Sequence, residues 1–262
     1  MNILITGACG GMGKATTRLL KEQGHMVFAL DRKITQPIEG VTYYEVDLTK
    51  MNEIESISKE IRSKIETLDV ILHFAGIYNL DSLVEISEEE WIKIFNINLF
   101  GVYRVNKVFL SFLKKNSKII ITSSELAPLD PLPFTGLYAI TKAALEKYAY
   151  SLRMELNLLD IKVSIIRPGA VQTDLLDVST SSLDRFCENT HLYKCNAKRF
   201  KDIVNSVEAK KIEATKIAKI ASKIVHSKRP KYVYNINRNV MLKLLHLLPK
   251  RLQVTIIKKI VK

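Results

Sequence analysis

Tyr138 and Lys142 are the residues whose types and spacing most directly suggest chemistry. They lie four positions apart at the start of the predicted helix Tyr138–Leu159, which places them on one helix face. A phenol has an unperturbed pKa of about 10. A neighbouring ammonium group favours the phenolate and lowers that pKa, so the pair can exchange a proton with a substrate oxygen. Ser124, a further polar side chain, follows the predicted strand Lys118–Thr122.

A glycine-rich segment follows the first predicted strand, Asn2–Thr6, and opens the predicted helix Gly13–Gln23. It reads Thr-Gly-Ala-Cys-Gly-Gly-Met-Gly over residues 6–13. Glycines let backbone N–H groups approach a pyrophosphate, and the helix N-terminus adds a partial positive charge. In a strand–helix–strand unit this pattern predicts a dinucleotide site. The loop residues that we expect to contact the dinucleotide are Gly7, Cys9, Gly11, Met12 and Gly13.

Asp31 follows the second predicted strand, Met26–Leu30, eighteen residues after Gly13. A carboxylate at this place accepts hydrogen bonds from both ribose hydroxyls and repels a 2′-phosphate. Arg32, the next residue, could instead accept a phosphate. We therefore expect Asp31 and Arg32 to lie at the adenosine ribose, with NAD as the cofactor and NADP as the alternative.

The elements that must position these residues alternate between short apolar strands and longer amphipathic helices. Such strands predict a parallel sheet covered on both faces, and right-handed crossovers make it a doubly wound, three-layer α/β fold of the Rossmann type. We expect one domain over residues 1–235, with a substrate lid over 174–201, followed by a basic amphipathic helical tail over 236–262. Further strands are predicted at Thr42–Val46, Val70–Phe74 and Lys162–Arg167, and further helices at Met51–Ile65 and Ser87–Leu113.

Five motifs occur in the order that is typical of the classical short-chain dehydrogenase/reductase family, which the chain resembles over roughly residues 1–230. They are the glycine loop, Asn98, the serine after a strand, Tyr138-x-x-x-Lys142, and Arg167-Pro168-Gly169 with Thr173 four residues beyond. The resemblance implies an enzyme that moves a hydride between a nicotinamide and a carbinol carbon. It implies that Tyr138 exchanges the proton, Ser124 binds the substrate oxygen, Lys142 also bonds the nicotinamide ribose, and Asn98 holds a water that links Lys142 to solvent. It assigns further cofactor contacts to Asp47, Leu48, Ala75, Gly76, Tyr138, Lys142, Pro168, Gly169, Val171 and Thr173.

Three positions depart from the family's pattern. The family places its serine thirteen residues before the tyrosine, where this chain has Glu125. Because an ionised carboxylate cannot donate a hydrogen bond, we expect Ser124 to take that role. The family's Asn-Asn-Ala-Gly reads His-Phe-Ala-Gly over residues 73–76, and we interpret His73 as a structural residue of a buried strand. Gly10 stands where members that prefer NADP often carry a basic residue, which again favours NAD.

Charge and cysteine usage limit the partners and the location. The chain has 40 Lys and Arg against 27 Asp and Glu, a net charge of +13, yet residues 1–200 hold 24 of each kind. The whole surplus lies in residues 201–262, so a uniformly basic nucleic-acid binder is a poor description. Cys9, Cys187 and Cys195 are widely spaced, which indicates a reducing compartment and argues against a disulfide framework or a metal site. Without a secretory signal or a spanning run of apolar residues, we expect a cytoplasmic protein.

The lid and the tail bear on the substrate and on the location within the cell. The apolar lid residues, with a hinge at Ser179–Ser182, predict a lipophilic secondary alcohol or ketone of steroid, retinoid or fatty type; they are Leu175, Leu176, Phe186, Leu192, Tyr193 and Phe200. The tail combines apolar residues at helical spacing with lysines and arginines. It either lies on an anionic membrane surface or packs on the body or across an oligomer interface.

Two alternatives to this function remain open from the sequence. One is a 3-oxoacyl reductase, whose acidic carrier protein would dock on a cationic face, although Asp31 argues against its usual cofactor, NADPH. The other is a catalytically silent dinucleotide sensor, against which the intact Tyr138, Lys142 and Asn98 argue. The resemblance also implies a homodimer or homotetramer, because Ser87–Leu113 and Tyr138–Leu159 are the family's usual subunit contacts.

Overall fold

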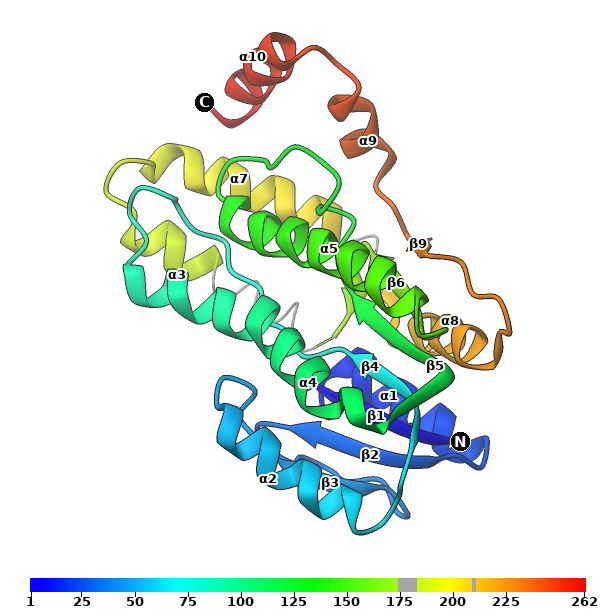
Figure 1. Ribbon diagram of the computed structural model, residues 1–262. Helices are drawn as coiled ribbons and strands as arrows, with labels where there is room; N and C mark the ends of the chain where they lie inside the picture. The colour runs from blue at the N-terminus through cyan, green and yellow to red at the C-terminus, as the bar shows by residue number, and fades with distance from the viewer. Residues whose placement is uncertain (174–182, 209–210) are drawn as a thin grey trace.

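The computed structural model describes residues 1–173, 183–208 and 211–262. Seven strands form one sheet in the order β3-β2-β1-β4-β5-β6-β9, and every neighbouring pair is parallel (Figure 1). The expected doubly wound α/β fold is therefore confirmed. The strands are β1 (Asn2–Thr6), β2 (Met26–Asp31), β3 (Thr42–Glu45), β4 (Leu68–His73), β5 (Leu113–Thr122), β6 (Lys162–Pro168) and β9 (Val233–Ile236), and a short β7 (Val171–Gln172) pairs with β8 (Ile212–Glu213).

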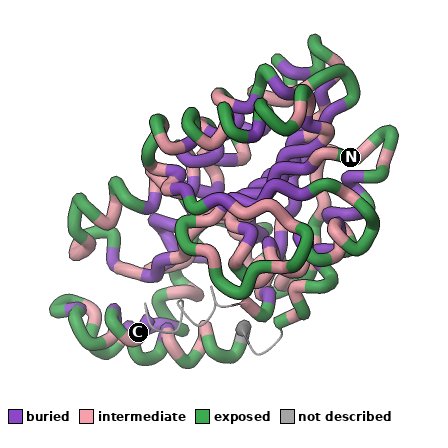
Figure 2. Tube along the Cα trace, turned by 90° about the horizontal axis from the view of Figure 1, so that it is seen from below, coloured by how far each residue is buried: buried purple, intermediate pink, exposed green. Residues whose placement is uncertain are grey.

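Helices cover the two faces of the sheet, as the continuous apolar strands require. Ile3 and Ile5 of β1 pack on the side of α1 (Gly11–Glu22) and α8 (Ala214–His226). Leu4, between them, packs on the opposite side with residues of α2 (Met51–Arg62) and α4 (Gly101–Phe109), and α5 (Gly136–Asn157) extends this second layer over β5 and β6. Figure 2 shows the resulting buried strands between two half-exposed helical layers.

The segment predicted as one helix, Ser87–Leu113, is helical without a break from Glu88 to Phe112, but it is not a uniform α-helix. It forms α3 (Glu88–Phe95), a π-helical turn η1 (Asn96–Phe100), α4, and a 3₁₀ turn η2 (Leu110–Phe112) that leads into β5. A π turn carries one more residue than an α turn, and such turns occur frequently at functional sites. Asn98, one of the expected catalytic residues, lies inside η1.

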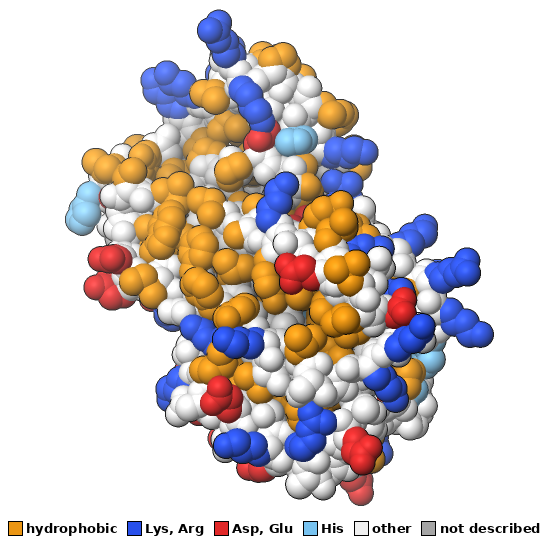
Figure 3. Space-filling model, in the orientation of Figure 1, with side chains coloured by type: hydrophobic (Ala, Val, Ile, Leu, Met, Phe, Trp, Pro, Cys, Tyr) orange, Lys and Arg blue, Asp and Glu red, His pale blue; other side chains and the backbone are white. Residues whose placement is uncertain are grey.

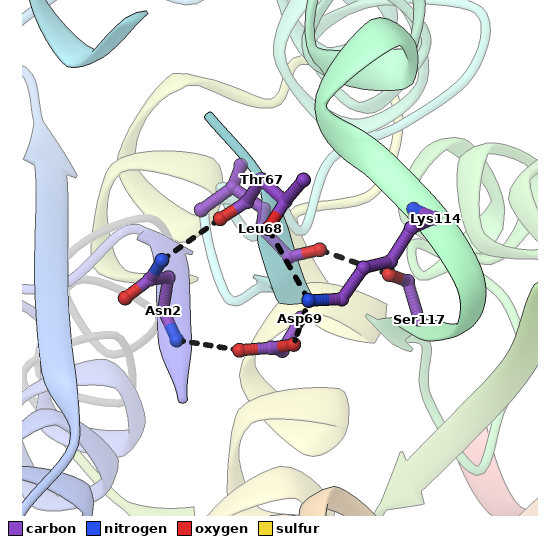
Figure 4. Close-up of polar contacts among 6 residues, drawn as sticks. All are labelled: Asn2, Thr67, Leu68, Asp69, Lys114 and Ser117. Carbon is purple, nitrogen blue, oxygen red and sulfur yellow. Dashed lines mark hydrogen bonds and ion pairs between the residues drawn. The ribbon is translucent and has the colours of Figure 1, made fainter. Parts of the chain in front are cut away.

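A small polar cluster joins the amino-terminal ends of the central strands β1, β4 and β5 (Figure 4). The backbone N–H of Asn2 donates to Asp69 Oδ2 at 2.8 Å, and the Asn2 side chain donates to the carbonyl oxygen of Thr67 at 2.9 Å. Lys114 Nζ lies 3.4 Å from Asp69 Oδ1, and Ser117 Oγ donates to the carbonyl oxygen of Leu68 at 2.9 Å. These contacts hold β1, β4 and β5 in a common alignment.

The C-terminal part of the chain folds over the carboxyl ends of the strands. It comprises α7 (Lys194–Glu208), α9 (Val240–His246) and α10 (Lys250–Val261), and α10 packs on α7. Val261 belongs to a buried cluster with Leu80, Phe186 and Phe200. The residue that opens the predicted tail, Ile236, is the last residue of β9 and so belongs to the sheet. Among the described residues no helix is both long and apolar enough to cross a membrane.

Candidate active site

Ser124, Tyr138 and Lys142 lie together at the carboxyl ends of the central strands. Ser124 follows β5, and the other two project from the first turns of α5 into the same cleft, which we name the catalytic cleft. Its described lining also includes Phe74, Ile77, Leu126, Thr173, Phe200 and Leu242. A second cleft, the cofactor cleft, shares Phe74, Gly76, Ile77 and Thr173 with it, so the two are continuous. Three of the four sequence-predicted catalytic residues thus face one cavity beside the expected dinucleotide site, whereas Asn98 is fully buried and lines neither cleft.

Burial dominates the electrostatics of the catalytic pair. Tyr138 is 8% and Lys142 is 5% exposed. Burial raises the pKa of Tyr138 to about 12, although its hydrogen bond with Ser124 acts in the opposite direction. Burial also lowers the pKa of Lys142 to about 8, against the attraction of the Glu146 charge. The sequence predicted a lowered pKa for Tyr138, and the structure corrects this: Lys142 Nζ lies over the phenol ring, 5.7 Å from its centroid, and donates to the carbonyl oxygen of Thr122 at 3.1 Å.

Asn98 anchors the loop after β4 through its amide group. Its Oδ1 accepts a hydrogen bond from the backbone N–H of Ile77 at 2.8 Å, and its Nδ2 donates to the carbonyl oxygen of Ile77 at 2.9 Å and to Thr141 Oγ1 at 3.2 Å. A Cβ on Gly76 would lie 3.2 Å from Asn98 Oδ1 and 3.6 Å from Lys142 Nζ. Asn98 and Lys142 therefore meet at the same glycine, at the junction of the two clefts.

The glycine loop is packed so closely that larger residues do not fit. Gly7 has a φ of +67°, and a Cβ there would lie 2.4 Å from the backbone nitrogen of Ala75. A Cβ on Gly13 would lie 2.0 Å from the carbonyl oxygen of Gly7. Gly11 and Met12 line the cofactor cleft between these two positions, and a Cβ on Gly11 would meet the side chain of Thr173. This cradle of bare backbone at the start of α1 fits a pyrophosphate.

Two carboxylates, Asp31 and Asp47, line the cofactor cleft beside the basic Arg32 and Lys93. Asp31 Oδ2 accepts a hydrogen bond from the backbone N–H of Cys9 at 2.8 Å, and Asp31 Oδ1 accepts one from that of Arg32 at 2.7 Å. Asp47 lines the same cleft, together with Leu48. Its burial acts to raise its pKa, but two hydrogen bonds from Thr49 outweigh it and lower the pKa. The donor and acceptor set therefore fits the adenosine half of a nicotinamide dinucleotide.

The residues predicted for the lid lie in different surroundings where the structure describes them. Phe200 lines the catalytic cleft, whereas Phe186 and Tyr193 pack on Phe134 with ring centroids 4.6 and 5.2 Å apart. Leu192 is exposed. Leu175, Leu176 and the predicted hinge Ser179–Ser182 lie outside the described residues. Pro168, Gly169 and Val171, expected at the cofactor, line the catalytic cleft.

Sequence reasoning missed Leu242 and assigned no role to Glu125, and both line the catalytic cleft. Leu242 comes from α9, more than one hundred residues after Tyr138, and no local pattern connects it with the site. Glu125 is 7% exposed and accepts a hydrogen bond from the backbone N–H of Asn239 at 2.6 Å. The extension that carries α9 and α10 is thus joined directly to the residue after Ser124.

His73 and the cysteines take no part in either cleft as far as the structure describes them. His73 Nε2 lies 2.9 Å from Asn106 Oδ1 inside β4, where the side chain is buried. Cys9 contributes its backbone N–H to Asp31, and Cys187 and Cys195 are free thiols. The described residues contain no group of three His, Cys, Asp or Glu side chains that could hold a metal ion.

Comparison with known proteins agrees with this geometry. A sequence model of the family described as short chain dehydrogenase matches residues 1–184. The 3-ketodihydrosphingosine reductase of Bacteroides thetaiotaomicron is 30% identical over 88% of this chain and 85% of its own length. The probable short-chain type dehydrogenase/reductase VdlC of Helicobacter pylori is 27% identical over 94% of this chain and 92% of its own length.

Solved structures share the fold over nearly the whole chain. An alcohol dehydrogenase from Thermococcus sibiricus, complexed with 5-hydroxy-NADP, superimposes with a TM-score of 0.71 at 25% identity, covering 95% of this chain and 98% of that one. A short chain dehydrogenase family protein from Francisella tularensis gives a TM-score of 0.75 at 24% identity, over 90% and 96% of the two chains. This chain belongs to the short-chain dehydrogenase family and is an NAD(P)-dependent oxidoreductase that acts on CH–OH groups.

Proposed function

We propose that this enzyme interconverts a lipophilic ketone and its secondary alcohol, with NAD as its cofactor. The observation that carries the proposal is the convergence of Ser124, Tyr138 and Lys142, each more than nine-tenths buried, in one cleft. The remaining walls of that cleft are largely apolar. The nicotinamide, when bound, supplies or accepts the hydride, and the residues of the chain supply the proton and the orientation.

Tyr138 is the proposed acid and base. With a pKa raised to about 12, its phenol stays protonated at neutral pH and can donate to a carbonyl oxygen. Ser124, already hydrogen-bonded to Tyr138, donates to the same substrate oxygen and fixes its position. Lys142 would hold the cofactor ribose, and Asn98 keeps the loop after β4 in place through its hydrogen bonds with Ile77. In this arrangement burial excludes water from the path of the hydride.

The names of relatives support a lipophilic substrate. Besides the 3-ketodihydrosphingosine reductase, they include estradiol 17-beta-dehydrogenase 2 of Rattus norvegicus, 30% identical over 66% of this chain. They also include the NADPH-dependent 1-acyldihydroxyacetone phosphate reductase of Saccharomyces cerevisiae, 26% identical over 76%. The apolar cleft residues Leu126, Phe200 and Ile203 suit an alkyl or ring substrate. Asp31 and its place at the ribose end support NAD rather than NADP.

A test of the chemistry is the substitution Tyr138→Phe. It removes the exchangeable proton but keeps the ring against Tyr78, where the two centroids lie 4.5 Å apart. We expect turnover of a panel of long-chain and ring ketones to fall by about a thousandfold or more, whereas NADH affinity stays within a few-fold. Substantial activity of this variant would contradict the mechanism. NADH binding without oxidation by any ketone would favour the dinucleotide sensor instead.

We also propose that α9 and α10 bring the enzyme to an anionic membrane surface. Their outward side exposes Met241, Leu247 and Val254 to 73%, 70% and 66%. Lys243, Lys250, Arg251, Lys258 and Lys259 accompany them, and the chain has no acidic residue after Glu213. An apolar surface edged with cations is suited to the headgroup region of anionic lipids.

A homodimer or homotetramer is the proposed assembly, formed through α4 and α5. Figure 3 shows hydrophobic side chains gathered on the face formed by α3, α4 and α5. Tyr150 and Met154 lie four residues apart on α5 and are exposed, as are Leu158 directly after this helix and Tyr103 on α4. The two helices are joined by a hydrogen bond from Asn106 Nδ2 to the Tyr148 hydroxyl. Light scattering should therefore report an oligomer.

A further inference from the structure

The catalytic cleft contains one charged group that the proposed chemistry does not use, the carboxylate of Glu125. Among the described side chains that line the cleft, Glu125 and Lys142 are the charged ones. Lys142 is committed to the cofactor ribose in the proposed mechanism. Placing a carboxylate in such surroundings costs free energy unless a partner compensates its charge. A ligand group that enters the cleft could therefore compensate the charge of this carboxylate.

The protein compensates the Glu125 charge incompletely. Its Oε2 accepts the hydrogen bond from the backbone N–H of Asn239, and the charge of Arg238 acts on it. Burial outweighs both and raises its pKa. No described residue donates a hydrogen bond to Oε1. This oxygen lies against Gly169, where a Cβ would come within 2.9 Å of it.

Glu125 Oε1 lies on the side of the cleft where the reacting end of a substrate would bind. Ser124, the adjacent residue, is the proposed donor to the substrate oxygen, and Gly169 belongs to the segment expected to contact the cofactor. A group attached to the carbon next to the carbonyl carbon would therefore lie near Glu125. The alkyl remainder of the substrate would lie along Phe200, Ile203 and Leu242.

We propose that Glu125 is a specificity-determining residue that binds a cationic amino group on the carbon next to the reacting carbon. The substrate class is then an amphiphilic amino ketone or amino alcohol with a long apolar chain. This inference rests on the proposed function. A charged N–H donor is the partner that a buried carboxylate favours most, because charge-assisted hydrogen bonds are roughly twice as strong as neutral ones.

The test compares two ketones that differ in one group. 1-Amino-2-tridecanone, as its hydrochloride, carries an ammonium where 3-tetradecanone carries a methyl group. We expect the wild type to prefer the amino ketone in kcat/KM by about tenfold or more, and Glu125→Gln to reduce that ratio to within about threefold. Glutamine keeps the shape and can still accept the Asn239 hydrogen bond, so the extension stays in place.

Asp130→Asn is the matched control, because Asp130 also binds the extension but does not line the cleft. It contacts His246 and Lys250. We expect this variant to keep the wild-type ratio. An equal fall of the ratio in both variants, or no fall in Glu125→Gln, would overturn the inference.

A second measurement does not depend on turnover. Dodecylammonium chloride should inhibit the wild type competitively, and Glu125→Gln should weaken this inhibition by about tenfold, whereas inhibition by 1-dodecanol changes little. Equal weakening for both inhibitors would contradict a charge-specific role. The absence of turnover of every ketone by an enzyme that binds NADH would contradict the proposed function instead, so the two failures are distinguishable.

Discussion

His73 is a buried side chain with one unpaired nitrogen, and its burial makes the stability of the protein depend on pH. Its Nε2 is paired with Asn106, and its Nδ1 has no hydrogen-bond partner among the described residues. Burial lowers its pKa from 6.5 to about 4, because a buried imidazolium loses its hydration. Between these two values the unfolded chain binds more protons at this site than the folded one. The free energy of unfolding therefore falls as the pH decreases through this range.

Replacing His73 by glutamine should remove this acid dependence. From pH 6.5 down to pH 5 the histidine costs about 2 kcal/mol of stability, calculated from about 1.4 kcal/mol per pH unit. We expect the difference in unfolding free energy between pH 7 and pH 5 to be smaller by about that amount in His73→Gln. Urea titrations followed by the fluorescence of the single tryptophan, Trp91, measure it. His191→Gln, at an exposed histidine, is the control, and an equal pH dependence in wild type and His73→Gln would contradict the assignment.

Asp31 should set the choice between the two cofactors. Asp31→Ala removes the acceptor of the ribose hydroxyls and the negative charge that repels a 2′-phosphate. We expect the NADPH-to-NADH ratio of kcat/KM to rise by about tenfold or more. Glu45→Gln removes the same charge from the neighbouring position of β3 and should leave the ratio unchanged. A wild type that already prefers NADPH would show that the Asp31 argument fails.

Residue-level prediction worked where chemistry and spacing were local. The glycine loop and the Tyr138–Lys142 spacing each lie within one short segment, so their geometry follows from a turn or a helix. The pKa of Tyr138 did not follow, because it depends on how deeply α5 is covered and on where the Lys142 ammonium points. The hydrogen bond between Glu125 and Asn239 joins residues 114 positions apart, and the sequence pattern of neither segment predicts it.

At the scale of elements, the extension is held to the catalytic loop at two points. Glu125 binds the backbone at Asn239, and Asp130 binds His246 and Lys250 of α9 and of the first turn of α10. Farther on, Asn196 Nδ2 of α7 donates to the carbonyl oxygen of Val261 at 2.9 Å. The loop that carries Ser124, helix α7 and the extension are therefore joined to one another.

Removing the second attachment should loosen the extension without unfolding the sheet. The ion pair of Asp130 with Lys250 lies near the surface, so Asp130→Asn should change global stability by about 1 kcal/mol or less. We expect faster amide hydrogen exchange over residues 240–262 and unchanged exchange in β1 and β4. Asp184→Asn, which removes the ion pair with Lys201, is a matched control on the lid side. Unchanged exchange over the extension would contradict the role of Asp130.

Strand β9 shows why some elements escape prediction. The sequence Val233-Tyr-Asn-Ile236 is short, half-buried and at the edge of the sheet, so it lacks the continuous apolar run of β1 or β4. It becomes a strand because β6 presents its free edge there, with Ile165 paired to Val233. Tertiary context decides such segments more than their own composition does.

At the scale of the whole molecule, the charge is divided between a neutral body and a cationic C-terminal part. We expect the protein to sediment with vesicles that contain phosphatidylglycerol, and a smaller fraction of it to do so as the salt concentration increases. With vesicles of phosphatidylcholine alone, little of the protein should sediment. Leu247→Glu combined with Val254→Glu should reduce binding by about tenfold. Leu192→Glu, an exposed leucine outside the extension, should not. Equal partitioning of all three proteins would overturn the membrane proposal.

The π turn at Asn96–Phe100 has a consequence for the helical phase of the segment around it. Each residue advances an α-helix by about 100°, so the extra residue of a π turn shifts everything after it by that angle. Ile94 before the turn packs with Leu137 and Tyr138, whereas Val105 and Phe109 after it pack on the sheet. One continuous helical segment thus contributes side chains to two hydrophobic clusters, one around Tyr138 and one against the sheet. A regular α-helix could not direct these side chains toward both clusters. Deleting a single residue from the turn would rotate one core out of register and move the Asn98 amide away from Ile77.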